Sequence, residues 1–273
     1  MSDFLAAAVQ ITSTSNIEAN FSIAEEQIEL ASRRGAELVG LPENFAFLGD
    51  DQKRLEIAST LSEKCSHFLV TMARRYQVVL LGGGFPVPAG DGQHTLNRAE
   101  LVGRDGQLLC RYDKIHLFDV DLPDGNKYRE SETVISGGNL PCVVDIPGLC
   151  KIGLSICYDV RFPELYRYLI SQGAELLMIP AAFTAFTGKD HWQILLQSRA
   201  IENTAYVVAP AQTGLHYRRR QSHGHAMIID PWGTVMADAG IQPGAAIAPV
   251  DNSRVKSIRN QMPCINHRKK DLF

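Results

Sequence analysis

Apolar runs and amphipathic stretches alternate along this chain. Residues 3–12, DFLAAAVQIT, form an apolar run with the length of a buried strand. Over residues 17–31 the apolar side chains recur every three or four positions, which places them on one face of a helix that ends at Gly35. The alternation continues and predicts strands over 36–42 and 78–85, a helix over 52–75, and a hairpin over 97–112 that turns at Arg104-Asp105-Gly106.

A second block of alternating elements follows residues 118–138, which are polar and loop-like. Strands that alternate with helices indicate an α/β protein. No stretch has the composition of a linker, so we predict one domain over residues 1–273. The expected elements of this block are strands over 150–157, 174–180, 205–211, 225–233 and 244–251, and helices over 163–172 and 190–203.

Two segments resemble each other. GAELVGLPENF (35–45) and GAELLMIPAAF (173–183) share a glycine stop, an apolar strand, a proline and a phenylalanine three positions later. Strands that are apolar throughout have both faces covered, so the pair indicates two sheets with helices outside. Coincidence is the alternative, because a glycine before an apolar strand is common in α/β proteins. Glu43 in the first copy aligns with Ala181 in the second, and a carboxylate at that position calls for a chemical reason.

The composition excludes several classes of protein. The formal charge is −3, and no basic stripe or acidic tail suggests a nucleic-acid partner. No apolar run approaches the length that spans a bilayer, and the N-terminal residues lack the pattern of a targeting signal. The six cysteines form no C-x-x-C pair and no disulfide framework, which indicates a reducing compartment. We therefore expect a cytoplasmic protein with no membrane partner.

Two polar clusters have ordinary interpretations. Residues 218–220 are three arginines, which predict a solvated loop, with contact to an anionic substrate as the alternative. His223 and His225 are close in sequence, but no cysteine or acidic cluster flanks them at the spacing of metal ligands. We expect no metal and no cofactor.

Three ionisable residues each stand at or just beyond an apolar run: Glu43, Lys114 and Cys157. In open α/β sheets, ligands bind beyond the carboxyl ends of strands, so these side chains could converge there. A thiol nucleophile, a carboxylate base and an ammonium that stabilises an oxyanion form a coherent site, in which the ammonium or the base lowers the pKa of the thiol. Taken singly, each residue also has a structural interpretation, as core filler, as an edge residue or as a partner of an arginine.

Longer segments decide between these interpretations. They resemble successive signatures of the nitrilase superfamily, the carbon–nitrogen hydrolases, and they run through nearly the whole chain. The resemblance implies an α/β fold built as a four-layer α-β-β-α sandwich. The segments are GLPENF (40–45), YDKIHLFD (112–119), YRES (128–131), the run from Gly153 to Phe183, the run from Thr187 to Gly214, and GHAMIIDPWG (224–233).

The resemblance also implies roles for individual residues. Glu43, Lys114 and Cys157 match the Glu-Lys-Cys triad of the superfamily, and Glu130 matches a second glutamate that holds the lysine or orients substrate. Cys157 would attack an amide carbon while Glu43 takes its proton. Lys114 and the backbone N–H of Tyr158, a residue that we also expect to contact substrate, would stabilise the oxyanion.

Substrate recognition is assigned by the same route. A guanidinium can bind a carboxylate with two parallel hydrogen bonds, and Arg161 follows the nucleophile by four positions. Thr187 and Phe183 would line the pocket beside it. A structural pairing of Arg161 with Asp159 or Glu164 is the alternative.

Within the superfamily, the chain resembles the branch whose enzymes hydrolyse deaminated glutathione to 2-oxoglutarate and cysteinylglycine. The segments that carry this are CYDVRFPEL (157–165), TGKDHW (187–192), residues 211–233 and HRKKDLF (267–273). The alternatives are an ω-amidase acting on 2-oxoglutaramate, another aliphatic amidase or nitrilase, and a non-catalytic binding or scaffold protein. The family also implies a homo-oligomer, most simply a dimer.

Overall fold

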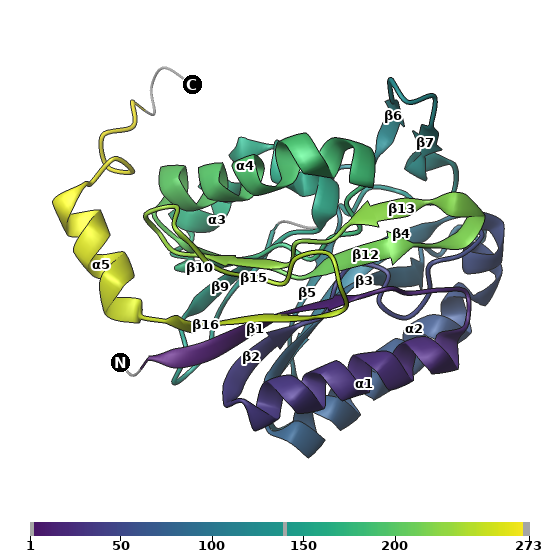
Figure 1. Cartoon of the computed structure of the whole chain (residues 1–273), viewed down its shortest axis with the longest axis horizontal. Coiled ribbons are helices and arrows are strands. Elements are labelled where there is room, and N and C mark those ends of the chain that lie inside the picture. The colour runs from purple at the N-terminus through teal and green to yellow at the C-terminus, as the bar shows by residue number, and fades with distance from the viewer. Residues whose placement is uncertain (1–2, 139–140, 270–273) are drawn as a thin grey trace.

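Two β-sheets stack face to face, and a pair of helices covers the outer side of each (Figure 1). The computed structural model describes residues 3–138 and 141–269. The larger sheet has the strand order β13-β12-β1-β2-β3-β4-β5, and β16 also pairs with β1. Its strands are β1 (Phe4–Ile11), β2 (Ala36–Gly40), β3 (Val79–Pro88), β4 (Thr95–Val102), β5 (Leu108–Asp113), β12 (Ala211–Leu215), β13 (Gln221–His223) and β16 (Gly244–Val250).

The smaller sheet has the order β15-β14-β11-β10-β9-β8. In its centre β9, β10 and β11 run parallel, and the connections between them are helical. The strands are β8 (Val143–Asp145), β9 (Lys151–Leu154), β10 (Leu176–Met178), β11 (Tyr206–Ala209), β14 (Met227–Ile229) and β15 (Val235–Asp238). The predicted four-layer α-β-β-α sandwich is confirmed.

Capping hydrogen bonds mark the residues at which the first two helices begin. The side chain of Asn16 accepts a hydrogen bond from the N–H of Ala19, and that of Asp50 accepts one from Lys53, which satisfies N–H groups that a helix leaves free. Helices α1 and α2 pack on the larger sheet, and α3 and α4 pack on the smaller one. The helices are α1 (Ile17–Arg33), α2 (Asp51–Tyr76), α3 (Pro163–Ser171), α4 (Ala185–Asn203) and α5 (Asn252–Gln261).

Two apolar clusters hold the layers together. One fills the space between the sheets and beneath α3 and α4, and it includes Leu38 and Met178. The other lies between the larger sheet and α1 and α2, and it includes Val39 and Ile28. The neighbours Leu38 and Val39 thus enter different clusters, because successive side chains of a strand point to opposite faces. A Cβ on Gly40 would lie 2.7 Å from Met178 Cε, so the two sheets approach closely at a position where only a hydrogen fits.

Some elements differ from the prediction. Helix α4 begins at Ala185, five positions before the acidic residue that suggested its start, because the extended backbone of Thr184 already leads into it. The loop-like segment contains a short hairpin, β6 (Asp119–Asp121) and β7 (Lys127–Arg129). Helix α5 was not predicted, since it buries only Asn252, Val255 and Ile258 and has no sustained apolar face.

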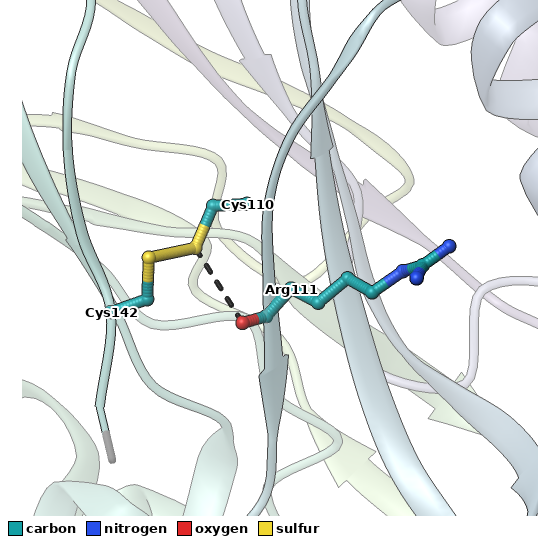
Figure 2. Close-up of a disulfide and its surroundings, with 3 residues drawn as sticks. All are labelled: Cys110, Arg111 and Cys142. Atoms are coloured by element: carbon teal, nitrogen blue, oxygen red, sulfur yellow. Dashed lines mark hydrogen bonds between the residues drawn. A yellow bond between two sulfur atoms is a disulfide. The ribbon is translucent and has the colours of Figure 1, made fainter. Parts of the chain in front are cut away.

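A disulfide links Cys110 of β5 to Cys142, which precedes β8 (Figure 2). The two residues are 32 positions apart in sequence and their Cα atoms lie 6.9 Å apart. The expectation that the cysteines form no disulfide is wrong for this pair, because only the approach of β5 to β8 brings the two together. Cys157 is among the free cysteines of the described chain.

No helix within residues 3–138 and 141–269 combines the length and the apolar character needed to cross a membrane.

Candidate active site

A cavity of about 240 Å³ opens beyond the ends of strands from both sheets. Glu43 follows β2, Lys114 follows β5, and Cys157 lies just beyond β9. The convergence that was expected beyond the strand ends is therefore present. The residues that line the cavity are Glu43, Asn44, Asp51, Arg54, Lys114, Phe118, Lys127, Tyr128, Arg129, Glu130, Glu132, Cys157, Tyr158, Ala182, Phe183, Thr184, Thr187 and Arg220.

The Glu43 carboxylate is buried and fully engaged by hydrogen-bond donors. Its Oε1 accepts from Lys114 Nζ at 3.2 Å and from Asn97 Nδ2 at 2.9 Å. Its Oε2 accepts from the backbone N–H of Ala182 at 2.9 Å, across the gap between the two sheets. These donors hold the carboxylate in one orientation, and Ala182 directly follows Ala181, the counterpart of Glu43, so the two similar segments meet at this hydrogen bond. One copy supplies the carboxylate and the other supplies the donor that holds it.

Lys114 lies between two carboxylates. Its Nζ is 2.9 Å and 2.8 Å from the two oxygens of Glu130, besides its contact with Glu43. Glu130 in turn accepts a hydrogen bond from the N–H of Phe118 at 2.7 Å. Burial by itself lowers the pKa of Lys114, but the charges of Glu130 and Glu43 outweigh burial and raise its pKa above the usual value. The ammonium is therefore a permanent charge in the cavity.

Cys157 sits on a sharp turn between β9 and α3. Its φ angle is +49°, a left-handed conformation that side chains other than glycine rarely adopt, and its N–H donates to Pro180 O at 2.9 Å. Strained backbone of this kind is found at catalytic turns that carry a nucleophile from a strand into a helix. The turn aims the thiol into the cavity, where Cys157 is 9% exposed.

The protonation state of the Cys157 thiol differs from the one that the sequence predicted. Burial and the neighbouring Glu43 charge raise the pKa of Cys157 well above its usual value, and Lys114 only partly offsets them. Burial also acts to raise the pKa of Glu43, but Lys114 and the hydrogen bonds from Cys157 and Ala182 bring the net pKa below its usual value. At neutral pH the site thus holds a thiol beside a carboxylate. The expected lowering of the thiol pKa is wrong, because Glu43 repels the thiolate that Lys114 attracts.

The Asp159 side chain stabilises the turn that carries Cys157, a role that the sequence did not indicate. Its side chain is fully buried. It accepts hydrogen bonds from the N–H of Ile156 at 2.9 Å, from Tyr112 Oη at 2.7 Å and from the N–H of His116 at 3.1 Å, and His116 Nδ1 lies 2.7 Å away. These contacts tie the residue before the nucleophile to β5 and to the segment that carries Lys114. Only a three-dimensional arrangement reveals them.

Of the four predicted substrate-binding residues, three are among the described residues that line the cavity and one is not. Tyr158, Phe183 and Thr187 line the cavity as expected, and the Thr187 hydroxyl lies 2.7 Å from that of Thr184. Arg161 is not among the described residues that line it. Its guanidinium packs over the rings of Phe183 and Tyr158, with the carbon at 5.2 Å and 5.7 Å from the ring centres, and its Nη2 is 3.3 Å from Nδ1 of His191.

The position of Arg161 fits neither the predicted binding of substrate nor the alternative pairing with Asp159 or Glu164. The carboxylate of Asp159, its first proposed partner, is taken by other donors. Glu164 makes no recorded ion pair with it in the described chain. Arg161 lies behind two aromatic rings of the cavity wall, so a direct contact with substrate is not what the geometry shows.

The cavity also contains cations that were not singled out as site residues. Arg54 enters from α2, Lys127 and Arg129 from the β6–β7 hairpin, and Arg220 from the segment before β13. The signal available for Arg220 is the run of three arginines, for which the sequence predicts a solvated loop, with contact to an anionic substrate as the alternative. The solvated interpretation holds for Arg218, whose side chain is 76% exposed.

Residues 5–260 match the family model described as carbon-nitrogen hydrolase. This chain belongs to that family, within the nitrilase superfamily, and is an enzyme that hydrolyses carbon–nitrogen bonds.

Individual relatives agree with this assignment. A protein of Synechocystis named deaminated glutathione amidase is 60% identical over 98% of this chain and 99% of its own length. The crystal structure of the Caenorhabditis elegans NitFhit protein superposes with a TM-score of 0.94 at 39% identity, over 100% of this chain and 66% of that one. Saccharomyces cerevisiae Nit3, a member of branch 10 of the nitrilase superfamily, superposes with a TM-score of 0.85 at 28% identity, over 99% and 97% of the two chains.

Replacing Asp159 tests its supporting role. Asp159→Asn puts an amide where a buried carboxylate receives several donors, so we expect a loss of about 3 kcal/mol in the free energy of unfolding. Urea denaturation followed by circular dichroism measures it. Glu164→Gln, an exposed acid on the neighbouring helix, is the matched control and should change stability by less than about 0.5 kcal/mol. Equal stability of the two variants would contradict the role.

Proposed function

We propose that this protein is an amidase that hydrolyses deaminated glutathione to 2-oxoglutarate and cysteinylglycine. The observation that carries the proposal is the meeting of Glu43, Lys114 and Cys157 in one cavity, with a neutral thiol beside an ionised carboxylate. The similarity to a Synechocystis protein named deaminated glutathione amidase supports the choice of substrate.

The first half of the reaction forms a thioester. The Glu43 carboxylate takes the thiol proton as Cys157 Sγ attacks the amide carbon, so the thiolate forms only as its bond to carbon forms. The negative charge then moves to the carbonyl oxygen, where the Lys114 ammonium stabilises it. Tyr158 is the second residue of a short helical turn (Cys157–Arg161), whose first N–H groups have no partner within the turn, so its N–H is available as a second donor.

Collapse of the first tetrahedral intermediate completes the thioester, whose hydrolysis then releases the acid. Glu43 gives its proton to the nitrogen of the leaving amine, the carbon–nitrogen bond breaks, and cysteinylglycine departs. A water then enters, Glu43 takes its proton, and hydroxide attacks the thioester carbon. Collapse of the second tetrahedral intermediate returns the proton to Cys157 and frees 2-oxoglutarate. Glu130 touches no reacting atom in this scheme and acts by holding the Lys114 ammonium in place.

The cavity lining is compatible with a doubly charged substrate. Deaminated glutathione carries a carboxylate at each end and uncharged amides between them. The triad occupies the buried end of the cavity, and its cations extend from α2 to the β6–β7 hairpin. 2-Oxoglutaramate shares the acyl half of this substrate and is the second candidate.

We further propose that the protein forms a homodimer and is cytoplasmic, a compartment in which the four free cysteines of the described chain would stay reduced. The apolar residues of α3, Leu165, Tyr166, Leu169 and Ile170, are buried within the chain itself and are not available for an interface. Support comes instead from α4, where Ile194 is 65% exposed and Ile201 45% exposed, next to Trp232 at 56%. Exposed apolar side chains of this kind suit contact with a second copy.

Activity tests the nucleophile. Cys157→Ala removes the attacking atom, so hydrolysis of deaminated glutathione should fall at least about 10³-fold. Cys264→Ala, a free cysteine outside the cavity, is the control and should retain full activity. Free cysteinylglycine reports the hydrolysis of deaminated glutathione, and released ammonia reports the hydrolysis of the comparison substrates 2-oxoglutaramate, glutamine and butyronitrile. Retained turnover by Cys157→Ala would discard the mechanism, and preference for 2-oxoglutaramate would change the substrate.

The pH profile tests the protonation states. Because the pKa of Glu43 lies below its usual value of 4.5, the base is ionised throughout the neutral range. We expect kcat/KM to be flat between pH 6 and about pH 8 and to fall only when the pH drops below 4.5, as Glu43 gains its proton. Circular dichroism at each pH confirms that the protein stays folded. A steep rise of kcat/KM across pH 6–8 would show that a thiol deprotonation controls the free enzyme instead.

Sedimentation velocity tests the dimer. Ile194→Glu places a charge on the apolar face of α4 and should convert the dimer to monomer at micromolar concentration, because burying an unpaired carboxylate is costly. Gln193→Glu puts the same charge on the neighbouring exposed position and is the control. If wild-type protein sediments as a monomer, the proposed dimer is wrong.

A further inference from the structure

We propose that Arg220 is the residue that binds a substrate carboxylate and thereby makes this enzyme select anionic amides. The inference rests on the proposed function and deepens it, because it names the group that recognises the charged end of the substrate. Arg161 had been expected in this role, but it lies behind the aromatic wall of the cavity.

Arg220 lines the cavity, and part of its side chain is buried. It lines the cavity, and its guanidinium carbon lies 5.6 Å from the centre of the Tyr128 ring, on β7. Its Nε is buried and has no hydrogen-bond partner within the described residues. One face of the guanidinium thus lies against an aromatic ring of the cavity, and at least its Nε donor has no acceptor in the described chain.

The other cations of the cavity already have partners. Lys114 is held by Glu43 and Glu130. Arg129 pairs with Asp121 at 2.7 Å.

Two more cations line the cavity. Arg54 also has a buried Nε without a partner, but its Nη2 lies 3.4 Å from Asp51 and donates to Thr133 at 3.1 Å. Lys127 is exposed on the hairpin, where water solvates its ammonium. Among the described cavity residues, Arg220 is therefore the partly buried cation that lacks a carboxylate partner.

The energetics favour an anion at this position. A guanidinium that is withdrawn from water without acceptors is costly, and a bound carboxylate would supply the missing hydrogen bonds. The planar fork of arginine matches a carboxylate with two parallel bonds, and stacking on an aromatic ring leaves the edge of the fork free to make them. The charge of Arg220 is also the smallest of the contributions that lower the pKa of Glu43, after those of Lys114, Cys157 and Ala182.

The backbone holds Arg220 in place before substrate arrives. Its carbonyl accepts from the N–H of His216 at 2.7 Å, and its own N–H donates to Tyr217 O at 3.1 Å. The buried His216 ring is in turn fixed between Ser13 O at 2.8 Å and Ser222 Oγ at 2.9 Å. The binding group is thus preorganised, so little ordering is needed when a carboxylate binds.

Arg218 provides a matched control in the same run of arginines. Its guanidinium lies 3.5 Å from Asp50, its side chain is 76% exposed, and it does not line the cavity. Replacing either arginine by glutamine removes one positive charge from the same segment, but only one of the two charges faces the substrate.

The experiment compares kcat/KM for wild type, Arg220→Gln, Arg220→Lys and Arg218→Gln on four amides. Deaminated glutathione carries both carboxylates, its glycinamide form and 2-oxoglutaramate carry only the acyl one, and butyramide carries none. For Arg220→Gln, the fall in kcat/KM for a substrate that carries the recognised carboxylate should exceed the fall in kcat/KM for butyramide by about 10- to 100-fold. Arg220→Lys, which keeps the charge without the fork, should lie between, and Arg218→Gln should match wild type.

The four substrates also show which end of deaminated glutathione carries the carboxylate that Arg220 binds. A selective loss that extends to 2-oxoglutaramate places Arg220 at the acyl end, whereas a loss confined to deaminated glutathione places it at the glycyl end. Equal losses on all four amides, or identical behaviour of Arg220→Gln and Arg218→Gln, would overturn the proposal. The lysine variant keeps the test usable if the glutamine variant does not fold.

Inhibition by glutarate separates this proposal from the proposed function. The inhibition constant for glutarate should rise about 10- to 100-fold in Arg220→Gln and stay within about twofold of wild type in Arg218→Gln. This comparison uses whichever amide the enzyme hydrolyses. If deaminated glutathione is not a substrate but the glutarate effect is present, the proposed function fails and the assignment of Arg220 stands. If deaminated glutathione is a substrate and Arg220→Gln shows neither the glutarate effect nor a selective loss on deaminated glutathione, the proposed function stands and the assignment of Arg220 fails.

Discussion

The contact between the Lys114 ammonium and two carboxylates is the constraint on which the rest of the site depends. Two negative groups and one positive group are removed from water together, and each unpaired charge there would be strongly destabilising. The cluster is tolerable because nearly every lone pair has a donor: Asn97 and Ala182 serve Glu43, and Phe118 serves Glu130. A cluster satisfied in this way is rigid, and rigidity is what an oxyanion site requires, because its charge must be in place before the reaction begins.

The same cluster decides how the thiol reacts. A lysine alone beside Cys157 would favour a thiolate, but the cluster also brings the Glu43 carboxylate to the sulfur. In the proposed mechanism the proton therefore stays on sulfur until a carbon is within reach, and the base that takes it is already ionised. A buried neutral thiol is also protected from chance oxidation, since the thiolate is the reactive form. The positive φ of Cys157 adds to this arrangement by aiming the sulfur at one place in the cavity.

Much of the fold and the centre of the site were accessible from the sequence. The runs around Leu38 and Leu177 are apolar on both faces, which predicted two covered sheets, and the longer motifs predicted the sandwich and the three residues of the triad. Elements that were missed lack such a pattern: the β6–β7 hairpin is polar, and α5 buries few side chains. The disulfide, the support of the turn by Asp159 and the place of Arg161 also went unseen, because each depends on contacts between distant segments. That a single domain spans residues 1–273 stays a prediction.

The sequence by itself determined which residues stand at the ends of buried strands, because hydrophobic periodicity is a local property that a few neighbouring residues encode. It therefore identified the acid, the amine and the thiol as candidates. Only the tertiary structure decided their protonation states and partners, since Glu43 meets Lys114 across 71 positions and Ala182 across 139. It also decided which arginine faces the cavity, because exposure and pairing depend on everything that packs around a charge, and not on the residues beside it in the chain.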